Sequence, residues 1–493
     1  MWILALALGI VSQYLFVGNA AGISVVIFIL GFYGLFFYAA NGRMGGFDKW
    51  QGQSRSGWLL MVPIGLLVMT YAIFANRFFH LLNGVAIMIL VAAQTILLTR
   101  SGSQPWHKAG FFPDLVHRCI VKPFTYVSVP FGIVSNLVLP SEGIRTARGT
   151  LRKVSLGLLL AAPILIVVIA LLASADRIFQ SWLTEIPGWF QGLSVGEGVV
   201  RVMTAGGIAL YTFCYIWGLL VHKPADSTIG SSAAVNSSNS AEGNEAQQKA
   251  QMALDPISAG TLLISVNLVY ILFAVIQFSY LFGAANGLLP EGAAYAEYAR
   301  RGFTELVLVA LINLVLLLCG LHFVRREGVW MERVRKVSLS MLVICTVIML
   351  VSAYSRLSLY EDAYGYTQTR LLAHGFMLFL GVLLVTAFIR IWQERLSLSK
   401  AYICCAVIAY VVMNYVNLDA RIASNNIARY ERTGIIDIAY LGTLSADAAP
   451  ALLKLQEKQP DIESLNQVVD QLKERSRSRD QWPSWNLSEQ RLR

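Results

Sequence analysis

Apolar stretches recur along the chain from Met1 to about Asn417, and short polar loops separate them. Each stretch is close to the roughly 20 residues that a helix needs to cross the hydrocarbon core of a bilayer. The pattern therefore predicts an all-α fold: a polytopic helical integral membrane protein with about eleven transmembrane helices and a small helical C-terminal tail. We expect the spans at residues 2–17, 22–40, 57–75, 79–99, 154–174, 202–221, 259–283, 303–324, 337–357, 370–390 and 400–417.

The composition agrees with a membrane protein. Hydrophobic residues make up 56% of the chain, charged residues 14%, and the mean hydropathy is +0.58, which excludes an ordinary soluble protein of this length. Five of the six cysteines lie inside apolar stretches, and no CxxC pair or Cys/His ligand spacing occurs. The usual motifs for nucleotide binding, zinc proteases and serine hydrolases are absent. We therefore expect no disulfide framework, no metal site and no cofactor.

Lysine and arginine gather in four loops, at 41–56, 100–153, 325–336 and 390–400, which fall on one side when the spans alternate. The positive-inside rule makes that side cytoplasmic, so the N-terminus is expected inside and the tail 418–493 outside. The chain has a net charge of +10, whereas the tail has eleven basic and eleven acidic residues. The excess charge therefore belongs to the inner loops and suits the anionic lipids of the inner leaflet. No compact domain carries it, so nucleic acid is not an expected partner.

The predicted organisation has four parts. Residues 1–222 form an N-terminal membrane half of about six spans with the basic cytoplasmic loop 100–153, and residues 257–417 form a C-terminal half of about five spans. Segment 223–256 is rich in Ser, Ala, Asn, Gly and Gln and is expected to be a disordered cytoplasmic linker. Residues 418–493 form the extracytoplasmic helical tail.

Two segments leave the span count open. The first span ends in Val17-Gly18-Asn19-Ala20, which fits a signal-peptidase site, but no basic region precedes it, so we favour an uncleaved anchor. Segment 119–139 is interrupted by Lys122, Pro123 and Pro130, and we expect it to be interfacial or re-entrant rather than spanning.

The tail has its own helical signals. Ser445 can cap a helix through Ala449–Leu455 that has Pro450 in its first turn. Segment Asp461–Glu474 repeats apolar residues at helical spacing, which predicts an amphipathic helix. The Arg- and Trp-containing end beyond this helix is expected to be loose.

Candidate functional residues collect at the predicted outer ends of the last four spans and in the loop 354–370, which contains four tyrosines. A charge inside the hydrocarbon costs about 3 kcal/mol on insertion scales, so such groups must face one another or water. We predict that they line one outward-opening pocket, with 354–370 as its rim and 419–425 packed across it. The predicted binding residues are Arg301, Glu305, Arg356, Tyr360, Tyr364, Arg370, His374, Asn417 and Asp419.

The alternative is that each of these residues points separately to lipid headgroups, as interfacial cations and an aromatic belt do. No residue is assigned a catalytic or metal-binding role. Three amides lie deeper in the spans and are expected to hydrogen-bond between helices rather than to bind substrate. They are Asn267 and Gln277 in the seventh span and Asn313 in the eighth.

Four motifs occur in order over roughly residues 155–455. The first contains Leu156-Gly157, Ala162-Pro163, Leu171-Leu172-Ala173-Ser174-Ala175-Asp176 and Phe179, and the second is Tyr298-Ala299-Arg300-Arg301-Gly302-Phe303-Thr304-Glu305-Leu306. The third contains Arg356-Leu357-Ser358-Leu359-Tyr360-Glu361, Tyr364-Gly365, Thr367 and Arg370. The fourth contains Asn417-Leu418-Asp419, Asn425-Asn426-Ile427, Asp437, Tyr440-Leu441 and Leu444-Ser445-Ala446-Asp447-Ala448-Ala449-Pro450. This stretch resembles the bacterial membrane proteins of the domain-of-unknown-function 4173 family, which is close to its 4153 relatives. The resemblance implies a multi-span protein of the bacterial cell membrane and implies no established activity.

Three functions fit these observations. The first is a non-enzymatic component that senses, scaffolds or binds a partner, such as another membrane protein, through its outer face. The second is a transporter or channel with an outward-facing polar entry site, although few ionisable residues lie at mid-span. The third is an enzyme acting on a lipid or envelope precursor, with Glu305 and His374 as acid/base groups.

Overall fold

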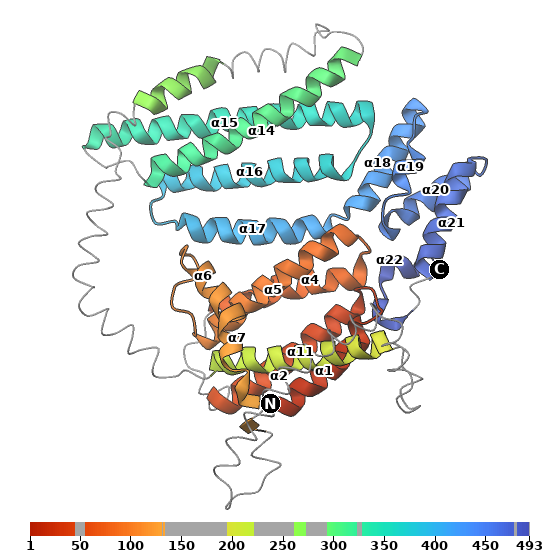
Figure 1. The fold of residues 1–493 in the computed structure, drawn as a ribbon. Helices are drawn as coiled ribbons and strands as arrows, with labels where there is room; N and C mark the ends of the chain where they lie inside the picture. The colour runs from red at the N-terminus through yellow and green to blue at the C-terminus, as the bar shows by residue number, and fades with distance from the viewer. Residues whose placement is uncertain are drawn as a thin grey trace, which may run out of the picture. The chain divides into compact units, whose positions relative to one another are not determined.

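The protein is described from a computed structural model over residues 1–44, 55–130, 132–133, 195–220, 261–272, 293–322, 328–477 and 481–492. Within these ranges the chain is helical and contains no strand, as the apolar pattern predicts (Figure 1). The chain divides into two compact units, of which the first also takes in the end of the chain. The first is Met1–Lys223 with Glu474–Arg493, and the second is Pro224–Lys473.

The first unit is built from long apolar helices and a few short helical turns. Its helices are α1 (Trp2–Phe16), α2 (Ile23–Met44), α3 (Arg55–Leu59), α4 (Met61–Ile73), α5 (Arg77–Thr99), α6 (Phe111–Val116), the π-helix η2 (His117–Val121), α7 (Lys122–Thr125) and α11 (Val195–Leu220). The 3₁₀ turn η5 (Trp482–Ser484) and α22 (Leu487–Gln490) complete it from the end of the chain.

The second unit has a membrane part and a tail. The membrane part comprises the helix Thr261–Leu272, α14 (Ala293–His322), α15 (Val329–Tyr364), α16 (Gln368–Trp392) and α17 (Leu398–Tyr415). The tail comprises α18 (Leu418–Thr433), α19 (Ile438–Leu441), the 3₁₀ turn η4 (Ala446–Ala448), α20 (Ala449–Lys458) and α21 (Glu463–Arg477), the last of which extends beyond the boundary of the unit.

Seven of the described helices are long and apolar enough to cross a membrane. They include α2, α5, α11, α15, α16 and α17, and the pair α3 and α4 together. Three shorter apolar helices, at Trp2–Phe16, Thr261–Leu272 and Leu306–Leu321, fall on three further predicted spans. The predicted span 154–174, the linker 223–256 and Gln277 lie outside the described residues. The chain is therefore a membrane-embedded helical protein.

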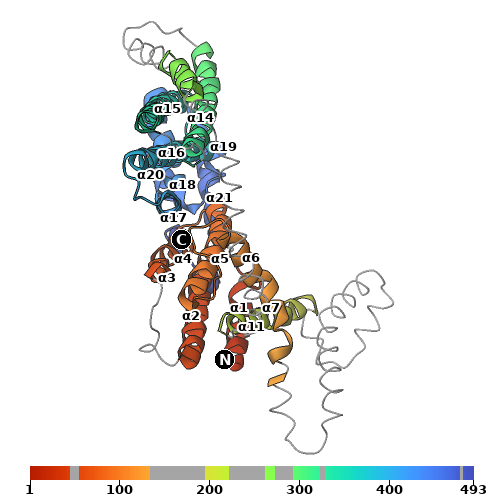
Figure 2. The same ribbon diagram turned by 90° about the vertical axis from the view of Figure 1, so that its left-hand side faces the viewer.

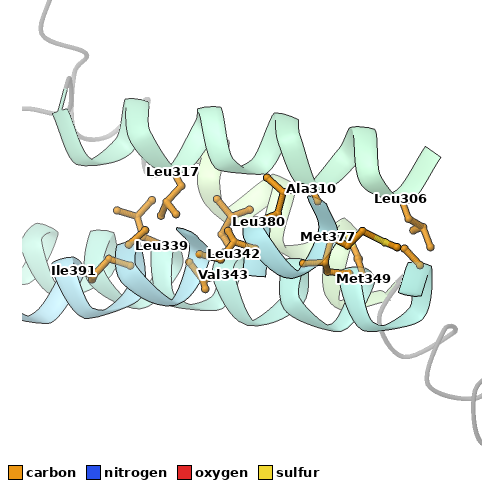
Figure 3. Close-up of a cluster of buried hydrophobic side chains, with 14 of the residues drawn as sticks. Leu306, Ala310, Leu317, Leu339, Leu342, Val343, Met349, Met377, Leu380 and Ile391 are labelled. Carbon is orange, nitrogen blue, oxygen red and sulfur yellow. The ribbon is translucent and has the colours of Figure 1, made fainter. Parts of the chain in front are cut away.

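The core of the second unit lies between α14, α15 and α16, where side chains from the three helices interdigitate (Figure 3). Leu317, Leu339 and Leu342 are fully buried there. By contrast, Val337, Ile344 and Val351 recur every seven residues along α15 and are about half exposed or more. This spacing places them on one stripe of the helix, which suits contact with lipid. Figure 2 views α15 and α16 nearly end-on, with α14 beside them.

Two amides connect the helices inside this core. Asn313 Nδ2 donates to Thr346 Oγ1 at 2.9 Å, and Asn267 Nδ2 donates to the carbonyl oxygen of Ser338 at 2.8 Å. Hydrogen bonds of this kind hold helices together where burial of apolar surface gives no preference for protein over lipid. The prediction that Asn267 and Asn313 link helices is confirmed.

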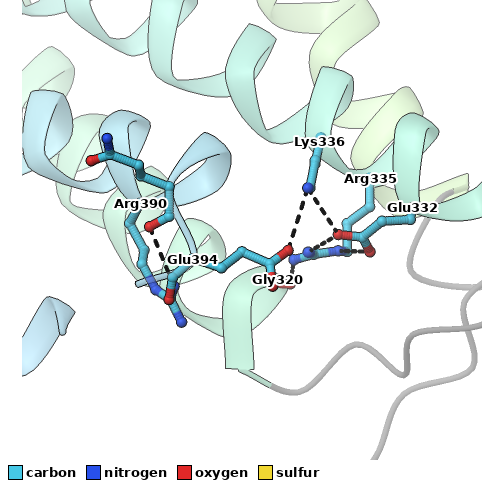
Figure 4. A network of polar contacts seen from close by, with 7 residues as sticks. Gly320, Glu332, Arg335, Lys336, Arg390 and Glu394 are labelled. Carbon is cyan, nitrogen blue, oxygen red and sulfur yellow. Dashed lines mark hydrogen bonds and ion pairs between the residues drawn. The ribbon is translucent and has the colours of Figure 1, made fainter. Parts of the chain in front are cut away.

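A charged network joins the helix ends at one end of the second unit (Figure 4). Lys336 Nζ lies 3.3 Å from Glu394 Oε1, between α15 and the α16–α17 turn. The buried Arg335 is held by Glu332 at 2.6 Å and donates to the carbonyl oxygen of Gly320 at 3.2 Å. The predicted loops 325–336 and 390–400 therefore meet at the same end of this unit.

The first unit also brings to one end the helix ends that border its two predicted basic loops. A Cβ atom added to Gly57, at the start of α3, would lie 3.0 Å from Leu98 Cδ2 near the end of α5. The Trp58 ring stacks on that of Phe37 in α2, with 5.7 Å between the centroids. The ends of α2 and α5 and the start of α3 therefore lie together.

The end of the chain packs against the opposite ends of these helices. The amide of Ala20 donates to Ser484 Oγ at 2.9 Å, and the amide of Ile23 donates to the carbonyl oxygen of Trp485 at 3.0 Å. Asn486 Nδ2 donates to the carbonyl oxygen of Phe74 at 2.7 Å. The prediction that this end is loose is wrong, because its polar groups complete the α1–α2 and α4–α5 turns.

Helices α1 and α11 of the first unit approach each other closely at Gly9. Gly9 lies directly against Ala205 and Ala209 of α11, and an added Cβ atom would come within 2.9 Å of Ala209 Cβ and closer still to the carbonyl oxygen of Ala205. Small residues allow this approach, which is a common way for membrane helices to associate.

Gly9→Ala is expected to lower the stability of the detergent-solubilised protein by roughly 1–3 kcal/mol, because the new methyl group overpacks the backbone of α11. Gly34→Ala, in α2, is the matched control, since no atom of a packing neighbour lies within 4 Å of the Cβ position there. Thermal unfolding followed by circular dichroism compares the two. Equal melting temperatures for both variants would contradict the close α1–α11 packing.

Candidate functional site

The turn between α15 and α16 is short and is held by the tail. We predicted a loop over 354–370, but α15 continues to Tyr364, so only Gly365, Tyr366 and Thr367 join the two helices. The longer helix keeps its backbone hydrogen bonds satisfied to the very end of the span. Gly365 has φ +86°, and an added Cβ atom would lie 2.8 Å from Asn426 Oδ1. Both its conformation and the close approach of α18 therefore favour glycine here.

Asn426 of α18 pairs with the backbone of this turn. Its Oδ1 accepts from the Tyr366 amide at 2.9 Å, and its Nδ2 donates to the Tyr366 carbonyl oxygen at 2.8 Å. One side-chain amide thus satisfies both polar groups of a residue that lies outside any helix. Asn426 is buried, so these bonds are shielded from water.

Arg429, one turn further along α18, completes the C-terminal end of α15. Its Nε donates to the carbonyl oxygen of Asp362 at 2.8 Å, and a terminal guanidinium nitrogen donates to that of Ala363 at 2.6 Å. The last carbonyl groups of a helix have no partner within it and carry the negative end of the helix dipole. The buried guanidinium therefore acts as a charged cap for a helix on another segment of the chain.

The start of the tail lies across the same turn, through Asp419. This carboxylate is 1% exposed. Its Oδ1 accepts from Gln368 Nε2 at 2.7 Å, and its Oδ2 accepts from the Ser445 amide at 3.1 Å. The Gln368 amide in turn donates to the Tyr440 hydroxyl at 2.9 Å. Asp419 therefore links the first turn of α16 to two parts of the tail.

We call Asp419, Asn426 and Arg429, with their partners in the turn 362–368, the tail clamp. Asn417, also a predicted site residue, starts α18 in the left-handed conformation and accepts from the Ala420 amide at 3.3 Å, so it caps the helix. Ser445 accepts from the Asp447 amide and begins η4, which leads directly into α20 with Pro450 in its first turn, close to the predicted start.

Three predicted site residues gather on the side of the turn that faces α16. The Arg370 guanidinium donates to the carbonyl oxygen of Gly365 and lies 4.3 Å from the centroid of the Tyr360 ring. The rings of Tyr360 and Tyr364 are 5.0 Å apart. This cation–π arrangement stabilises the turn from within, as the tail clamp does from outside.

His374 has a different partner, Glu361 of α15. Its Nδ1 lies 3.3 Å from Glu361 Oε2, and its ring is tilted against that of Tyr354, with centroids 4.3 Å apart. Glu361 is 2% exposed, and its other oxygen, Oε1, has no hydrogen-bond partner among the described residues. His374 Nε2 lies 3.4 Å from Ser358 Oγ.

Five of the predicted residues fall into three sets of contacts. Arg370, Tyr360 and Tyr364 belong to the turn, Asp419 to the tail clamp, and His374 to the pair with Glu361. Arg356 is half-buried in α15 and has an interaction partner. Arg301 and Glu305 lie on α14, but their side chains are outside the described residues. Convergence of Glu305, Arg356 and His374 on one pocket stays a prediction.

The sequence reasoning missed Asn426 and Arg429 as site residues. A signal was available, because Asp419, Asn426 and Arg429 share the face of α18 that also carries the buried Leu418 and Ile422. Polar side chains on the apolar face of an amphipathic helix need partners from elsewhere in the fold. The sequence alone does not say that the partners are backbone groups at the end of another helix.

Comparison with known families identifies the chain. The family described as "Domain of unknown function (DUF4153)" matches residues 61–455. The chain belongs to this family. The match supports the 4153 part of the resemblance, and the relation to the 4173 family stays a prediction. It includes the turn and the tail clamp but not α1, α2, α21 or the end of the chain. No curated protein and no solved structure matches the chain.

Asn426→Asp is expected to lower the melting temperature and loosen the α15–α16 turn. The carboxylate still accepts from the Tyr366 amide, but it sets a second oxygen against the Tyr366 carbonyl group, at a cost of about 1–3 kcal/mol. Asn425→Asp adds the same charge at the adjacent, exposed position of α18 and should have little effect. Hydrogen exchange of the 362–368 amides measures the local effect, and equal exchange in both variants would contradict the clamp.

The surroundings of Tyr366 in this turn predict that its phenol titrates at a higher pH than a free tyrosine. Its burial and its hydrogen bond to Asp362 Oδ1, 3.0 Å long, raise the pKa of the phenol from 10.0 to about 12. Because the neutral phenol is favoured in the folded state, its contribution to stability is present below about pH 10 and is lost as pH rises towards 12. The difference in tyrosinate absorbance between wild type and Tyr366→Phe should titrate near pH 12. A midpoint near 10 would mean that the phenol is not held by Asp362.

Proposed function

We propose that this protein is a multi-pass component of the bacterial cell membrane that senses or binds a partner through its outer face. The observation that carries the proposal is the tail clamp. It fixes α18 to the turn between two membrane helices through buried side chains, so the exposed surface of the tail is presented in one orientation. Preorganisation of this kind lowers the entropic cost of binding.

The surface next to the clamp has the residues of a recognition site. Tyr364 and Ile435 are 53% and 64% exposed. Arg432 lies 3.9 Å from Asp362 Oδ1, and both charged side chains are more than half exposed. The Arg429 guanidinium joins the two sides, because it donates to the carbonyl oxygens of both Ala363 and Ile435. Exposed aromatic and arginine side chains are typical anchors at protein interfaces.

The orientation is part of the proposal. Within each unit, the predicted basic loops share one end, and the segments that contact the tail share the other. The positive-inside rule makes the basic end cytoplasmic, in contact with anionic lipids, and the clamp extracytoplasmic. The kinship with the 4173 family stays a proposal as well.

A transport function would need a polar path through the membrane. The buried charged side chains of the described residues lie near helix ends or in the tail: Arg335, Glu361, Asp419, Arg429, Asp447 and Glu489. Deeper in the membrane, Asn267 and Asn313 are buried amides that donate hydrogen bonds to a neighbouring helix. These features support docking over transport.

The test introduces single cysteines at Arg421 and Ile435, on the exposed side of the tail, in a background without the six native cysteines. Arg395→Cys, exposed in the α16–α17 turn at the opposite end, is the control. A membrane-impermeant maleimide that carries a photo-crosslinker is added to intact cells. We expect labelling at positions 421 and 435, none at 395, and one protein adduct of the same mass from both tail positions.

The control for the adduct is Asn426→Asp, which releases the clamp and should weaken the adduct from position 435 without changing labelling. Labelling at 395 and not in the tail would reverse the orientation. Labelling of the tail without any protein adduct would exclude a stable protein partner at this surface.

A further inference from the structure

Three side chains at the α15–α16 contact form a continuous chain of acid, imidazole and hydroxyl. Glu361 Oε2 lies 3.3 Å from His374 Nδ1, and His374 Nε2 lies 3.4 Å from Ser358 Oγ. Ser358 and Glu361 are three residues apart on α15 and so share one face of the helix. His374 reaches between them from α16. The order and the atoms are those of an acid–histidine–serine triad.

Exposure rises from the acid to the hydroxyl, which is the direction that such a triad needs. The side chain of Glu361 is 3% exposed and that of His374 12% exposed, whereas Ser358 is half-buried. The acid is thus shielded and the hydroxyl is accessible. A buried carboxylate next to Nδ1 holds that nitrogen as the proton donor, which leaves Nε2 of the neutral ring as the acceptor that faces Ser358.

Tyr354 contacts the His374 imidazole through both its ring and its carbonyl oxygen. Its ring lies against that of His374 and restricts the imidazole plane. Its carbonyl oxygen lies 3.0 Å from Ser358 Oγ, which donates to it, and 3.4 Å from His374 Nε2. The hydroxyl proton therefore has two acceptors. When the proton moves to Nε2, the same carbonyl oxygen can accept a hydrogen bond from the new Nε2–H group.

We propose that Ser358 is the nucleophile of an acyl-transfer site whose substrates are carboxylic esters with an acyl chain. The same stretch of α15 and α16 exposes Leu359 and Phe376, at 42% and 41%, which favours an acyl substrate. The inference goes beyond the proposed docking function, and either can hold without the other.

The reaction has two balanced halves. Ser358 Oγ attacks the ester carbonyl carbon while its proton passes to His374 Nε2, and Glu361 stabilises the imidazolium through Nδ1. The ester C–O bond then breaks, the alcohol leaves with the proton from Nε2, and the acyl group stays on Ser358. In the second half, water gives a proton to Nε2 and attacks the acyl carbon. The fatty acid leaves and Ser358 Oγ regains the proton, so ester and water give acid and alcohol.

The test exposes the purified full-length protein to an alkyl fluorophosphonate, which forms a covalent bond only with an activated serine. Intact mass and peptide mapping locate the adduct. We expect one adduct on Ser358, none in Ser358→Ala, and a labelling rate at least about 100-fold lower in His374→Gln, the lower range for loss of a general base. Ser355→Ala, one turn earlier on α15, is the matched control and should label like wild type.

Glu361 is a positioning residue and needs its own readout. Glu361→Gln should slow labelling, and Glu361→Asp should restore part of the rate, while circular dichroism confirms that both are folded. Hydrolysis of a p-nitrophenyl acyl ester should follow the same order of variants. Absence of a Ser358 adduct in the folded wild-type protein would overturn the proposal whatever the variants do. An adduct whose rate does not depend on His374 would also overturn it.

Discussion

A helix that ends at a membrane surface leaves four carbonyl groups without partners inside the helix, and the bilayer offers none. The second unit meets this constraint at the end of α15 with side chains from α18, a helix that lies more than 50 residues further along the chain. Arg429 satisfies the carbonyl groups of Asp362 and Ala363, and Asn426 satisfies both polar groups of Tyr366. The arrangement of the tail on the membrane part depends on these contacts.

The contacts also explain why both partners are buried although both are polar. An arginine on the buried face of α18 would be destabilising unless several acceptors met it, because an unpaired buried charge is costly. Here three carbonyl oxygens surround the guanidinium. Truncating the tail would therefore leave carbonyl groups of the turn unsatisfied, and Arg429 of α18 needs those groups in the same way. The clamp is cooperative because neither the turn nor α18 is complete alone.

The helices of the membrane part follow from the sequence because apolar length and the width of a bilayer suffice to define them. The amides Asn267 and Asn313 were predictable for a similar reason, since a polar group in that setting must pair with a neighbouring helix. The contacts of Asn426 and Arg429 were not predictable, because their acceptors are backbone carbonyl groups, and every residue type carries the same carbonyl group. The pairing of His374 with Glu361 and Ser358 depends on how α16 is rotated against α15, which periodicity leaves open.

The same reasoning applies to the end of the chain, where the sequence shows Trp and Arg residues but the fold uses a main-chain carbonyl group and short polar side chains. The Ile23 amide, at the start of α2, bonds the carbonyl oxygen of Trp485, and Ala20 bonds a side chain 464 residues away in sequence. The hydrogen bonds that complete the turn between α1 and α2 therefore cannot form until Ser484 and Trp485 have been synthesised. At about 5–20 residues per second this delay is roughly 20–90 seconds, much longer than a helix needs to form. During synthesis the α1–α2 turn must therefore stay incomplete until residues 484 and 485 have been made.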